Sequence, residues 1–303
     1  MPDVVLILAN PFSGKGPNRK RVDRLERTLS DAGLSPKVVW EREARTPALA
    51  ELGEDGRCVV AAGGDGSVAD VLNDMRAAGR LDLPFATLPC GNENLFAQAF
   101  GFSGEPEAIA RAIARGETVP CDLGQAGERL FTLMVSAGFD AEVVRRLDRW
   151  RTRTRNGSLK RVDRLRYAPR ILGTILGYRF AAVTLEADGR TIEGHQAYVF
   201  NLPQYGGGFR FAPDARPDDG VFDWVVFQKP GFLRLLLYHW RVVRGRHLGS
   251  SGVAHGQASA VTLHTADGVY LPTQADGDPA GATPLRVSVL PAAIRVIQGG
   301  TRG

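Results

Sequence analysis

Residues 58–68 read Cys-Val-Val-Ala-Ala-Gly-Gly-Asp-Gly-Ser-Val: an apolar run, a glycine-rich turn and the first residue of an amphipathic stretch. The apolar run at 58–62 predicts a buried strand, and the stretch that begins at Val68 predicts a helix. Glycines let the backbone turn sharply and approach a ligand closely, and the N–H groups at the start of a helix attract anions. The turn at 63–67 therefore predicts a phosphate-binding loop, with a turn needed only for chain geometry as the simpler alternative.

The same alternation of strand and helix extends to both sides of this turn. The expected strands and helices are, in chain order, strands 4–8, 36–40, 58–62 and 84–88 and helices 18–32, 47–52, 68–78 and 94–100. Such alternation is typical of a parallel sheet covered by helices. Ligands of these sheets bind outside the carboxyl ends of the strands. We therefore expect the loops at 10–16 and 89–94 to join the glycine turn in a nucleotide site.

Two other nucleotide-binding patterns fit this chain less well. The glycine turn matches a dinucleotide-binding pattern loosely, as Gly64-x-Gly66-x-x-Ala69, but Asp65 would then place a carboxylate where the pyrophosphate binds. A carboxylate suits a turn in which Mg²⁺ stands between it and the phosphates, or in which it contacts the phosphoryl acceptor. The loop at 10–16 is not a Walker A loop, because Lys15 is followed by glycine rather than Ser or Thr.

Beyond residue 128 the pattern changes to strands separated by short turns such as Asp188-Gly189 and Asp267-Gly268. This spacing predicts antiparallel β structure. Two helical insertions interrupt it, one from about 142 to 178 and one from 232 to about 246. The boundary between the two halves is expected near residues 121–128. The expected strands are 130–136, 181–187, 196–201, 221–227, 258–264, 269–275 and 285–290.

Composition limits where the protein works and what it binds. The 303 residues are 44% hydrophobic and 23% charged, which is enough for one large or two ordinary globular domains. No stretch approaches the roughly 18 apolar residues of a membrane span, and the first ten residues lack the features of a signal peptide. Three widely separated cysteines argue against a disulfide framework or a zinc site. A reducing cytoplasm is the expected location.

The net charge of +5 is unevenly distributed. Residues 145–170 hold eleven Lys and Arg against two Asp, a local charge of +9 that leaves the rest of the chain at −4. Clustered cations attract anionic lipid headgroups or nucleic acid. A solvated basic helix is the plain alternative. Nucleic acid is not expected as a partner, because few aromatic residues are interleaved with these cations.

Further motifs follow in the second half of the chain. Residues 201–208 read Asn-Leu-Pro-Gln-Tyr-Gly-Gly-Gly, residues 211–215 read Phe-Ala-Pro-Asp-Ala, and Asp219-Gly220 and Asp276-Gly277-Asp278 come later. Together with the glycine loops, and in this order, they resemble the diacylglycerol kinase catalytic-domain family. That family includes bacterial soluble lipid kinases, sphingosine kinases and ceramide kinases. The resemblance covers nearly the whole chain.

The resemblance implies a two-domain architecture. An α/β domain at residues 1–125, with a parallel sheet like that of phosphofructokinases and NAD kinases, would bind the nucleotide. An antiparallel β-sandwich domain at 126–290, with helical insertions, would bind the lipid substrate, and residues 291–303 would return to the first domain. The implied activity is ATP-dependent phosphorylation of the hydroxyl of a membrane lipid, such as diacylglycerol or a sphingoid or ceramide lipid. ATP and Mg²⁺ are the implied cofactors.

The resemblance also assigns roles to individual positions. The proton acceptor would be Asp278, with Asp65 as the rival from the glycine turn. A structural Mg²⁺ would bind the Asp219 carboxylate and the backbone carbonyls of Arg216 and Val221. The residues that would contact the nucleotide or its phosphates are Asn10, Ser13, Gly14, Gly63, Gly64, Asp65, Gly66, Ser67, Asn92 and Asn94. Apart from the resemblance, Lys15 or an arginine of the basic stretch is a candidate to screen the charge that develops during phosphoryl transfer.

Three positions depart from the family pattern. Asn92 stands where the family has Thr, Asp278 stands where it has Glu, and Val39 or Trp40 stands where a nucleotide-contacting Thr is expected. The shorter reach of Asp278 matters because small displacements of catalytic groups are costly in rate. These departures keep a binding protein without turnover as an alternative. NAD kinases also carry such a glycine turn before a helix, so an NAD kinase-like enzyme with a soluble substrate is another alternative.

A lipid kinase must reach its acceptor at a bilayer, and the sequence offers two segments for that contact. The basic stretch at 145–170 and the helix expected at 232–246, which mixes leucines and aromatics with arginines, predict peripheral contact with an anionic membrane. A buried amphipathic helix would have the same pattern. The oligomeric state has no sequence signal.

Overall fold

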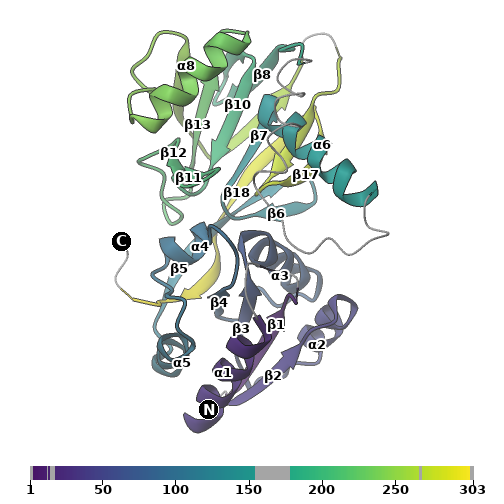
Figure 1. The fold of residues 1–303 in the computed structure, drawn as a ribbon, viewed down its shortest axis with the longest axis vertical. Helices are drawn as coiled ribbons and strands as arrows, with labels where there is room; N and C mark the ends of the chain where they lie inside the picture. The colour runs from purple at the N-terminus through teal and green to yellow at the C-terminus, as the bar shows by residue number, and fades with distance from the viewer. Residues whose placement is uncertain (1–2, 12, 14–17, 154–177, 266–267, 301–303) are drawn as a thin grey trace. The chain divides into compact units, whose positions relative to one another are not determined.

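The computed structural model describes residues 3–11, 13, 18–153, 178–265 and 268–300. The chain divides into two compact units (Figure 1). The first comprises Met1–Leu123 with Pro291–Gly303, and the second comprises Gly124–Leu290. Within the described residues, no helix is long and apolar enough to cross a membrane.

The first unit is built on a parallel sheet. Its strands lie in the order β2 (Ser35–Val39), β1 (Val4–Ala9), β3 (Gly56–Gly63) and β4 (Phe85–Pro89), and each neighbouring pair is parallel. Every residue of β1 and β4 is buried, which explains the uninterrupted apolar sequence of β1. In β4 the buried hydroxyl of Thr87 donates to the carbonyl of Ala61 at 3.0 Å. The last part of β18 (Leu285–Ile297) pairs in parallel with β4 through Val296 and Phe85.

Helices follow the strands of this sheet along the chain. In α1 the residues Val22, Leu25 and Leu29 are buried, three and four positions apart, as on one face of an amphipathic helix. The sequence predicted the first four strands and their helices to within a few residues, but it missed α5, which begins at Pro106 and ends before Gly116. The helices are α1 (Asn18–Asp31), η1 (Arg42–Ala44), α2 (Arg45–Ala50), α3 (Asp65–Ala77), α4 (Leu95–Ala99) and α5 (Pro106–Arg115).

The second unit is antiparallel β structure. One sheet of six strands has the order β14 (Val253–Ala258), β13 (Phe222–Phe227), β10 (Gln196–Phe200), β7 (Met134–Gly138), β16 (Pro272–Ala275) and β17 (Asp278–Ala282). Further strands of this unit are the first part of β18, then β15 (Ala260–His264), β8 (Val183–Ala187) and β9 (Arg190–Gly194), which belong to the same ten-stranded hydrogen-bonded sheet as the strands of the first unit. Their apolar faces share one core, which includes Val135, Leu185, Val199, Trp224 and Val287. The predicted fold class, α/β followed by an antiparallel β domain, is confirmed.

Shorter elements complete the second unit. Strand β5 (Thr118–Ala126) leads into it and pairs with β6 (Arg129–Phe131), while β11 (Gln204–Tyr205) and β12 (Phe209–Arg210) form a small hairpin. Two helices, α6 (Phe139–Arg153) and α8 (Phe232–Val243), lie in the two predicted helical insertions. Residues 154–177, most of the predicted first insertion and much of the basic stretch, lie outside the described residues.

Several predicted strand limits were wrong. The single strand predicted at 130–136 is two strands, β6 and β7. The backbone N–H groups of residues 132 and 133 donate to the carboxylate of Asp276 instead of to a neighbouring strand, so the strand is interrupted there. Strand β16 begins only at Pro272, and β18 continues to Ile297 instead of stopping at 290. Strands β9, β14 and β17 were missed, since their sequences are polar or rich in glycine.

Candidate functional site

Three loops of the first unit converge at the carboxyl ends of their strands. Asn10, which follows β1, donates from Nδ2 to Ser67 Oγ at 3.0 Å, and the hydroxyls of Ser13 and Ser67 lie 3.2 Å apart. The loop after β4 is tied to the end of β3, because the N–H of Cys90 donates to the carbonyl of Gly63 at 2.7 Å. The predicted convergence of these loops is confirmed, and it is a direct result of the parallel strand order β1–β3–β4.

Glycine is required where two of these loops touch. A Cβ placed on Gly91 would lie 2.5 Å from the Cα of Gly64, and one placed on Gly64 would lie 3.0 Å from the Cα of Gly91. A Cβ on Gly63 would overlap the side chain of Ser67. These three positions therefore exclude larger residues by their contacts with protein, independently of any need to approach a phosphate.

The glycine turn leaves backbone donors at the start of α3. The carbonyl of Gly64 accepts from the N–H groups of Ser67 at 2.9 Å and Val68 at 3.0 Å, so the helix begins here. Among the described residues, the N–H groups of Asp65 and Gly66 have no such acceptor, and the residues are only partly buried. First-turn N–H groups of this kind bind phosphate oxygens. Gly14 and Lys15, which were also predicted to lie here, fall outside the described residues.

Asp65 faces the start of the short helix α4. Its Oδ1 accepts from the N–H of Phe96 at 3.0 Å. Burial raises the pKa of Asp65, and the backbone N–H groups of Phe96, Leu95 and Asn94 oppose that rise. The carboxylate therefore has a structural task, capping a helix in the neighbouring loop, in addition to any task in catalysis.

The two asparagines of the loop at 89–94 have different surroundings. Asn94 adopts a left-handed backbone conformation, accepts from the N–H of Gly91 at 2.8 Å and donates to the carbonyl of Gly91 at 3.1 Å. Its amide thus closes the loop that touches Gly64. Asn92 is exposed, and its side chain makes no hydrogen bond within the part of the chain that the structure describes. Of the two, Asn92 is the one available to a ligand.

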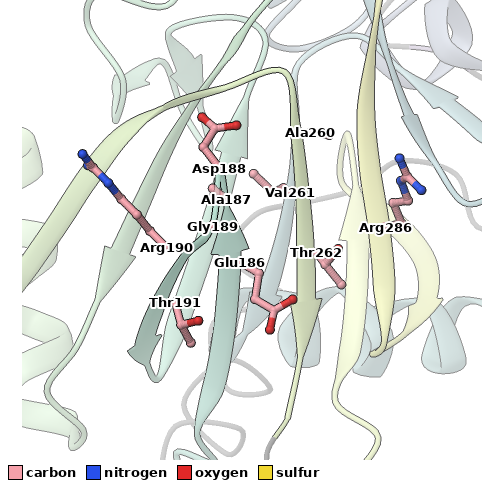
Figure 2. Close-up of a pocket in the computed structure, with 10 residues that line it drawn as sticks. All are labelled: Glu186, Ala187, Asp188, Gly189, Arg190, Thr191, Ala260, Val261, Thr262 and Arg286. Carbon is pink, nitrogen blue, oxygen red and sulfur yellow. The ribbon is translucent and has the colours of Figure 1, made fainter.

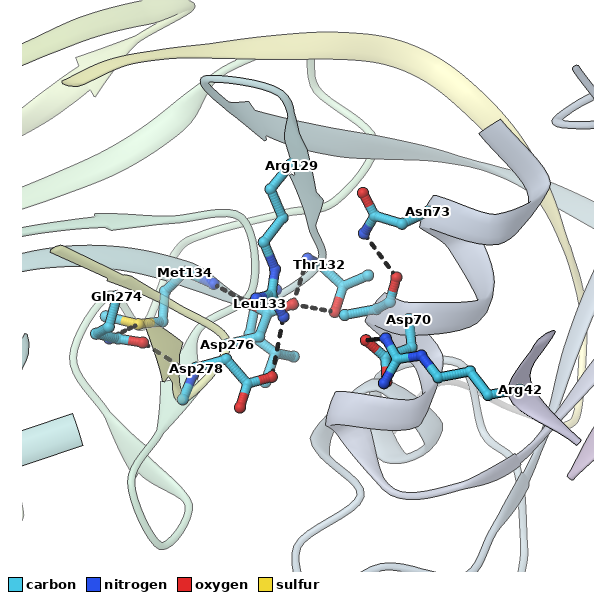
Figure 3. A network of polar contacts seen from close by, with 12 residues as sticks. Arg42, Asp70, Asn73, Arg129, Thr132, Leu133, Met134, Gln274, Asp276 and Asp278 are labelled. Carbon is cyan, nitrogen blue, oxygen red and sulfur yellow. Dashed lines mark hydrogen bonds and ion pairs between the residues drawn. The ribbon is translucent and has the colours of Figure 1, made fainter. Parts of the chain in front are cut away.

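In the second unit, Asp276 is a buried anchor. Its Oδ2 accepts from the N–H and the hydroxyl of Thr132 at 2.7 and 3.0 Å, and its Oδ1 accepts from the N–H groups of Leu133 at 2.8 Å and Met134 at 3.0 Å (Figure 3). Burial raises the pKa of Asp276, and these hydrogen bonds oppose the rise. Sequence reasoning missed this role, because the motif alone does not reveal which of its two acids is buried.

Asp278, two residues later, is the accessible carboxylate of the same turn. Its Oδ2 lies 2.9 Å from a guanidinium nitrogen of Arg129, and the two side chains are 39% and 28% exposed. Figure 3 shows Arg129 reaching from the β6 side toward Asp278. Arg129 was not predicted as a site residue, and a single arginine in a short hairpin gives no sequence signal. This ion pair places the guanidinium of Arg129 next to the carboxylate that the sequence predicts as the proton acceptor.

A second buried carboxylate, Asp140, is linked to this turn through the side chain of Gln274. Asp140 accepts from Ser136 Oγ at 2.7 Å and from Gln274 Nε2 at 2.9 Å, and burial raises its pKa. The other end of the same amide, Gln274 Oε1, accepts from the N–H of Gly277 at 2.8 Å. Asp140 and Gln274 thus link α6 and β16 to the turn that carries Asp278, and neither was singled out in the sequence.

The predicted structural metal turn lies just before β13. Asp219 is exposed, and its Oδ1 accepts from the N–H of Val221 at 3.3 Å, while Arg216 pairs with Asp218 at 3.2 Å. In the described ranges no group of three or more His, Cys, Asp or Glu side chains could hold a metal ion. The turn offers one carboxylate and nearby carbonyls, the donor types that Mg²⁺ uses together with water.

A hollow of about 450 Å³ lies elsewhere in the second unit, over β8, β9, β15 and β18 (Figure 2). Arg190 and Arg286 lie at opposite sides of the hollow in this view, and Glu186 Oε1 lies 3.0 Å from His264 Nε2. It contains none of the predicted site residues. The hollow is therefore not part of the candidate site.

Comparisons with known proteins agree with this two-part arrangement. Residues 4–126 match the family model described as the diacylglycerol kinase catalytic domain, and residues 133–298 match the one described as the YegS C-terminal NAD kinase beta sandwich-like domain. A crystal structure described as a diacylglycerol kinase from Bacillus anthracis strain Sterne superposes with a TM-score of 0.71 at 19% identity, covering 98% of this chain and 97% of that one. That likeness concerns the fold.

Relatives at the sequence level cover almost the full length. A probable YegS-like lipid kinase from Pseudomonas putida is 32% identical over 279 residues, covering 88% of this chain and 87% of that protein. A diacylglycerol kinase from Mycobacterium tuberculosis is 28% identical over 307 residues, covering 97% and 94%. The chain therefore belongs to the diacylglycerol kinase catalytic-domain family and is an ATP-dependent lipid kinase, a phosphotransferase that acts on a hydroxyl group.

Proposed function

We propose that Asp278 is the general base of this kinase and that the acceptor is the hydroxyl of a membrane lipid such as diacylglycerol or a sphingoid or ceramide lipid. The assignment rests on the different surroundings of the two acids of one turn, Asp276 and Asp278. Asp276 is buried with four hydrogen bonds, whereas Asp278 is partly exposed and pairs with a side chain. A general base must reach the proton that it removes, and Asp278 is the acid of this turn that remains accessible.

Arg129 acts in this proposal as a positioning residue for Asp278. Asp is one methylene shorter than the Glu expected at this position, so the placement of its carboxylate is more demanding. The turn is fixed by Asp276 and Gln274, and the guanidinium at 2.9 Å holds the carboxylate from the side. Arg129→Gln should lower kcat about tenfold with an unchanged KM for ATP, and Arg129→Lys should retain more activity. An equal loss in both variants would limit Arg129 to packing.

The glycine turn of the first unit is the proposed phosphate site. The N–H groups of Asp65 and Gly66 would bind phosphate oxygens, with Ser67 and Asn10 at the edge. Gly63 and Gly64 complete the turn, the hydroxyl of Ser13 lies 3.2 Å from that of Ser67, and Asn92 is the exposed amide of the loop that touches the turn. Asn94 contributes indirectly, because its amide holds the adjacent loop closed. Gly14 keeps its proposed role on the family resemblance alone, and Lys15 keeps its proposed role of screening charge because it is a cation in the same loop.

Mg²⁺ is proposed as the cofactor that accompanies ATP. The residues fit it, because Asp65 is a partly exposed carboxylate next to the proposed phosphate-binding N–H groups. Magnesium typically binds one or two carboxylates together with substrate phosphates and waters, so a closed cage of protein ligands is not needed. When bound, it neutralises charge on the transferring phosphoryl group. A structural magnesium at Asp219, with the carbonyls of Arg216 and Val221, is proposed on the family pattern.

Asp65 is the rival for the role of base. Two observations favour Asp278: Asp65 caps α4 through Phe96, and it lies in the loop that provides phosphate-binding N–H groups. A carboxylate beside phosphates is better suited to a magnesium ion than to the acceptor hydroxyl. Substitution of Asp278 should leave ATP binding unchanged, whereas substitution of Asp65, which lies beside the proposed phosphate site, should affect it.

The proposal is tested by transfer of radiolabelled γ-phosphate to a panel of lipids in mixed micelles with Mg²⁺. Asp278→Asn should lower turnover by about 10²–10⁴-fold, the usual contribution of a general base, while ATP binding is kept. Asp278→Glu, which restores the family residue, should remain active. Unchanged turnover in Asp278→Asn would remove Asp278 from the role. Bound ATP without a labelled lipid in the unmodified protein would favour the binding-protein or soluble-substrate alternatives.

Peripheral contact with an anionic membrane is the remaining part of the proposal. The acceptor hydroxyl lies at the bilayer surface while its acyl chains stay in the membrane, so the enzyme must work at that surface. The protein carries a net charge of +5, which anionic lipids attract. Binding to anionic liposomes that weakens with added salt is expected. Binding that does not respond to salt would argue against an electrostatic contribution.

A further inference from the structure

The helix α8 uses only one side for packing. Leu235, Tyr238 and Val242 are buried at spacings of three and four residues. The ring of Tyr238 lies 4.6 Å from that of Phe227 in β13, and its hydroxyl donates to the carbonyl of Gly252 at 3.0 Å. This side is satisfied by the second unit's own residues, so the other side is not needed for the core.

The opposite side of α8 is apolar and exposed. Leu233 is 79% exposed, Val243 59%, Trp240 50%, Leu236 49% and Phe232 36%. Their spacing of three, four and seven residues places them along one stripe of the helix. The short strand β12, which contacts α8, adds the exposed Phe209 (Figure 1). Six of the eight exposed large hydrophobic side chains among the described residues therefore lie on α8 or β12.

Arginines lie beside this stripe, and the segment that carries them contains no acid of its own. Arg234, Arg241 and Arg244 project between the buried and the apolar sides, and residues 232–246 contain no Asp or Glu. The guanidinium of Arg244 lies over the ring of Trp240 at 4.4 Å from the centroid. An apolar stripe with adjacent cations matches the boundary between headgroups and acyl chains of an anionic bilayer.

We propose that the face of α8 formed by Phe232, Leu233, Leu236, Trp240 and Val243 docks on an anionic lipid bilayer. Its apolar side chains would enter the boundary between headgroups and acyl chains, and the arginines would contact lipid phosphates. A second copy of the chain is a poorer occupant, because pairing this face with itself brings like charges together. The inference rests on the proposed function, in that the acceptor lies in a membrane, but it assigns a surface that the transfer site does not include.

The test is cosedimentation with vesicles of phosphatidylcholine containing phosphatidylglycerol, compared with phosphatidylcholine alone. Replacing Leu233 and Trp240 together by Gln should weaken binding to the anionic vesicles at least about tenfold, given the value of burying two large apolar side chains. Arg241→Glu should weaken it about fivefold or more, given the contribution of one cation near the surface. Unchanged vesicle binding in both variants would overturn the proposal.

Matched controls separate this surface from general effects. Arg27→Glu on the exposed side of α1 changes the net charge by the same amount as Arg241→Glu, and Tyr270→Gln removes an exposed aromatic outside α8. Both should bind vesicles as the unmodified protein does. If Arg27→Glu weakens binding as much as Arg241→Glu, net charge rather than α8 is responsible and the proposal fails. Thermal unfolding confirms that each variant folds.

Phosphoryl transfer distinguishes failure of the docking surface from failure of the proposed function. With a short-chain diacylglycerol dissolved below its micelle concentration, the α8 variants should transfer phosphate within about twofold of the unmodified protein, since they do not touch the site. With the same headgroup in vesicles they should lose activity in parallel with binding. Loss with both substrates would contradict docking, and no transfer by the unmodified protein would contradict the proposed function instead. A shift from dimer to monomer in the α8 variants would identify a second copy as the occupant.

Discussion

Two turns that combine glycine with aspartate, 63–67 in the first unit and 276–278 in the second, use their acids differently. Asp65 faces backbone N–H groups of a neighbouring helix yet stays partly exposed. Asp276 accepts four hydrogen bonds and is buried, while Asp278 keeps its carboxylate near the surface beside Arg129. Within the second turn, the acid that accepts four hydrogen bonds is the buried one, and the acid two residues later is the one that stays accessible.

The largest expected effect is the loss of the buried anchor. Asp276→Ala leaves three backbone N–H groups and a hydroxyl without their acceptor, and at about 1 kcal/mol or more for each the free energy of unfolding should fall by about 4 kcal/mol. Asp278→Ala, by contrast, breaks one partly exposed ion pair and should change stability by less than about 1 kcal/mol. Urea unfolding measures both. Similar losses in the two variants would erase the distinction drawn between these acids.

A smaller effect is expected at Asp65, where two substitutions separate capping from chemistry. Asp65→Ala removes the acceptor of the Phe96 N–H and should cost about 1–2 kcal/mol of stability. Asp65→Asn keeps an acceptor oxygen and should fold normally, yet it should lower phosphoryl transfer because the charge that would hold Mg²⁺ is lost. Measuring unfolding and magnesium-dependent turnover for both variants checks this. Normal turnover in Asp65→Asn would reduce Asp65 to a helix cap.

The smallest expected effect is a pH dependence. Burial raises the pKa of Asp65 above its ordinary value of 3.8, so the folded protein holds this proton more tightly than the unfolded chain does. The folded state is therefore penalised above the raised pKa, and the penalty disappears as the pH falls through it. Asp65→Asn has no such penalty, so its stability relative to the unmodified protein should increase from acidic to neutral pH. A stability difference between the two proteins that stays constant across that range would mean that folding does not raise the pKa of Asp65.

Much of the fold was accessible from the sequence because the first unit follows periodic rules. Apolar strands such as β1, and their alternation with amphipathic helices, predicted a parallel sheet and the convergence of its loops. The division of 130–136 into two strands was not accessible, since it depends on Asp276, more than 140 residues away. Strands such as β17, with its sequence Asp-Pro-Ala-Gly-Ala, carry no apolar pattern to detect.

The candidate site was accessible in part. Glycine-rich loops at strand ends indicated where a nucleotide would bind, and the structure brings Asn10, Ser13 and Ser67 together there. Long-range partners such as Arg129 and Gln274 were not accessible, because their roles exist only through contacts with residues about 150 positions away or through a buried amide. Their identity as single polar residues in short strands gives no hint of either contact.

The path of β18 has a consequence for the order in which this protein can be made. Residues 291–298 belong to the first unit, where Ala292 donates to Asp122, Val296 pairs with Phe85 and Gln298 donates to Glu117. A ribosome produces them only after the whole second unit. The β4 side of the first unit's sheet therefore stays uncovered until residues 291–298 have been made, and a nascent chain stopped at residue 290 would carry a complete second unit beside an incomplete first unit.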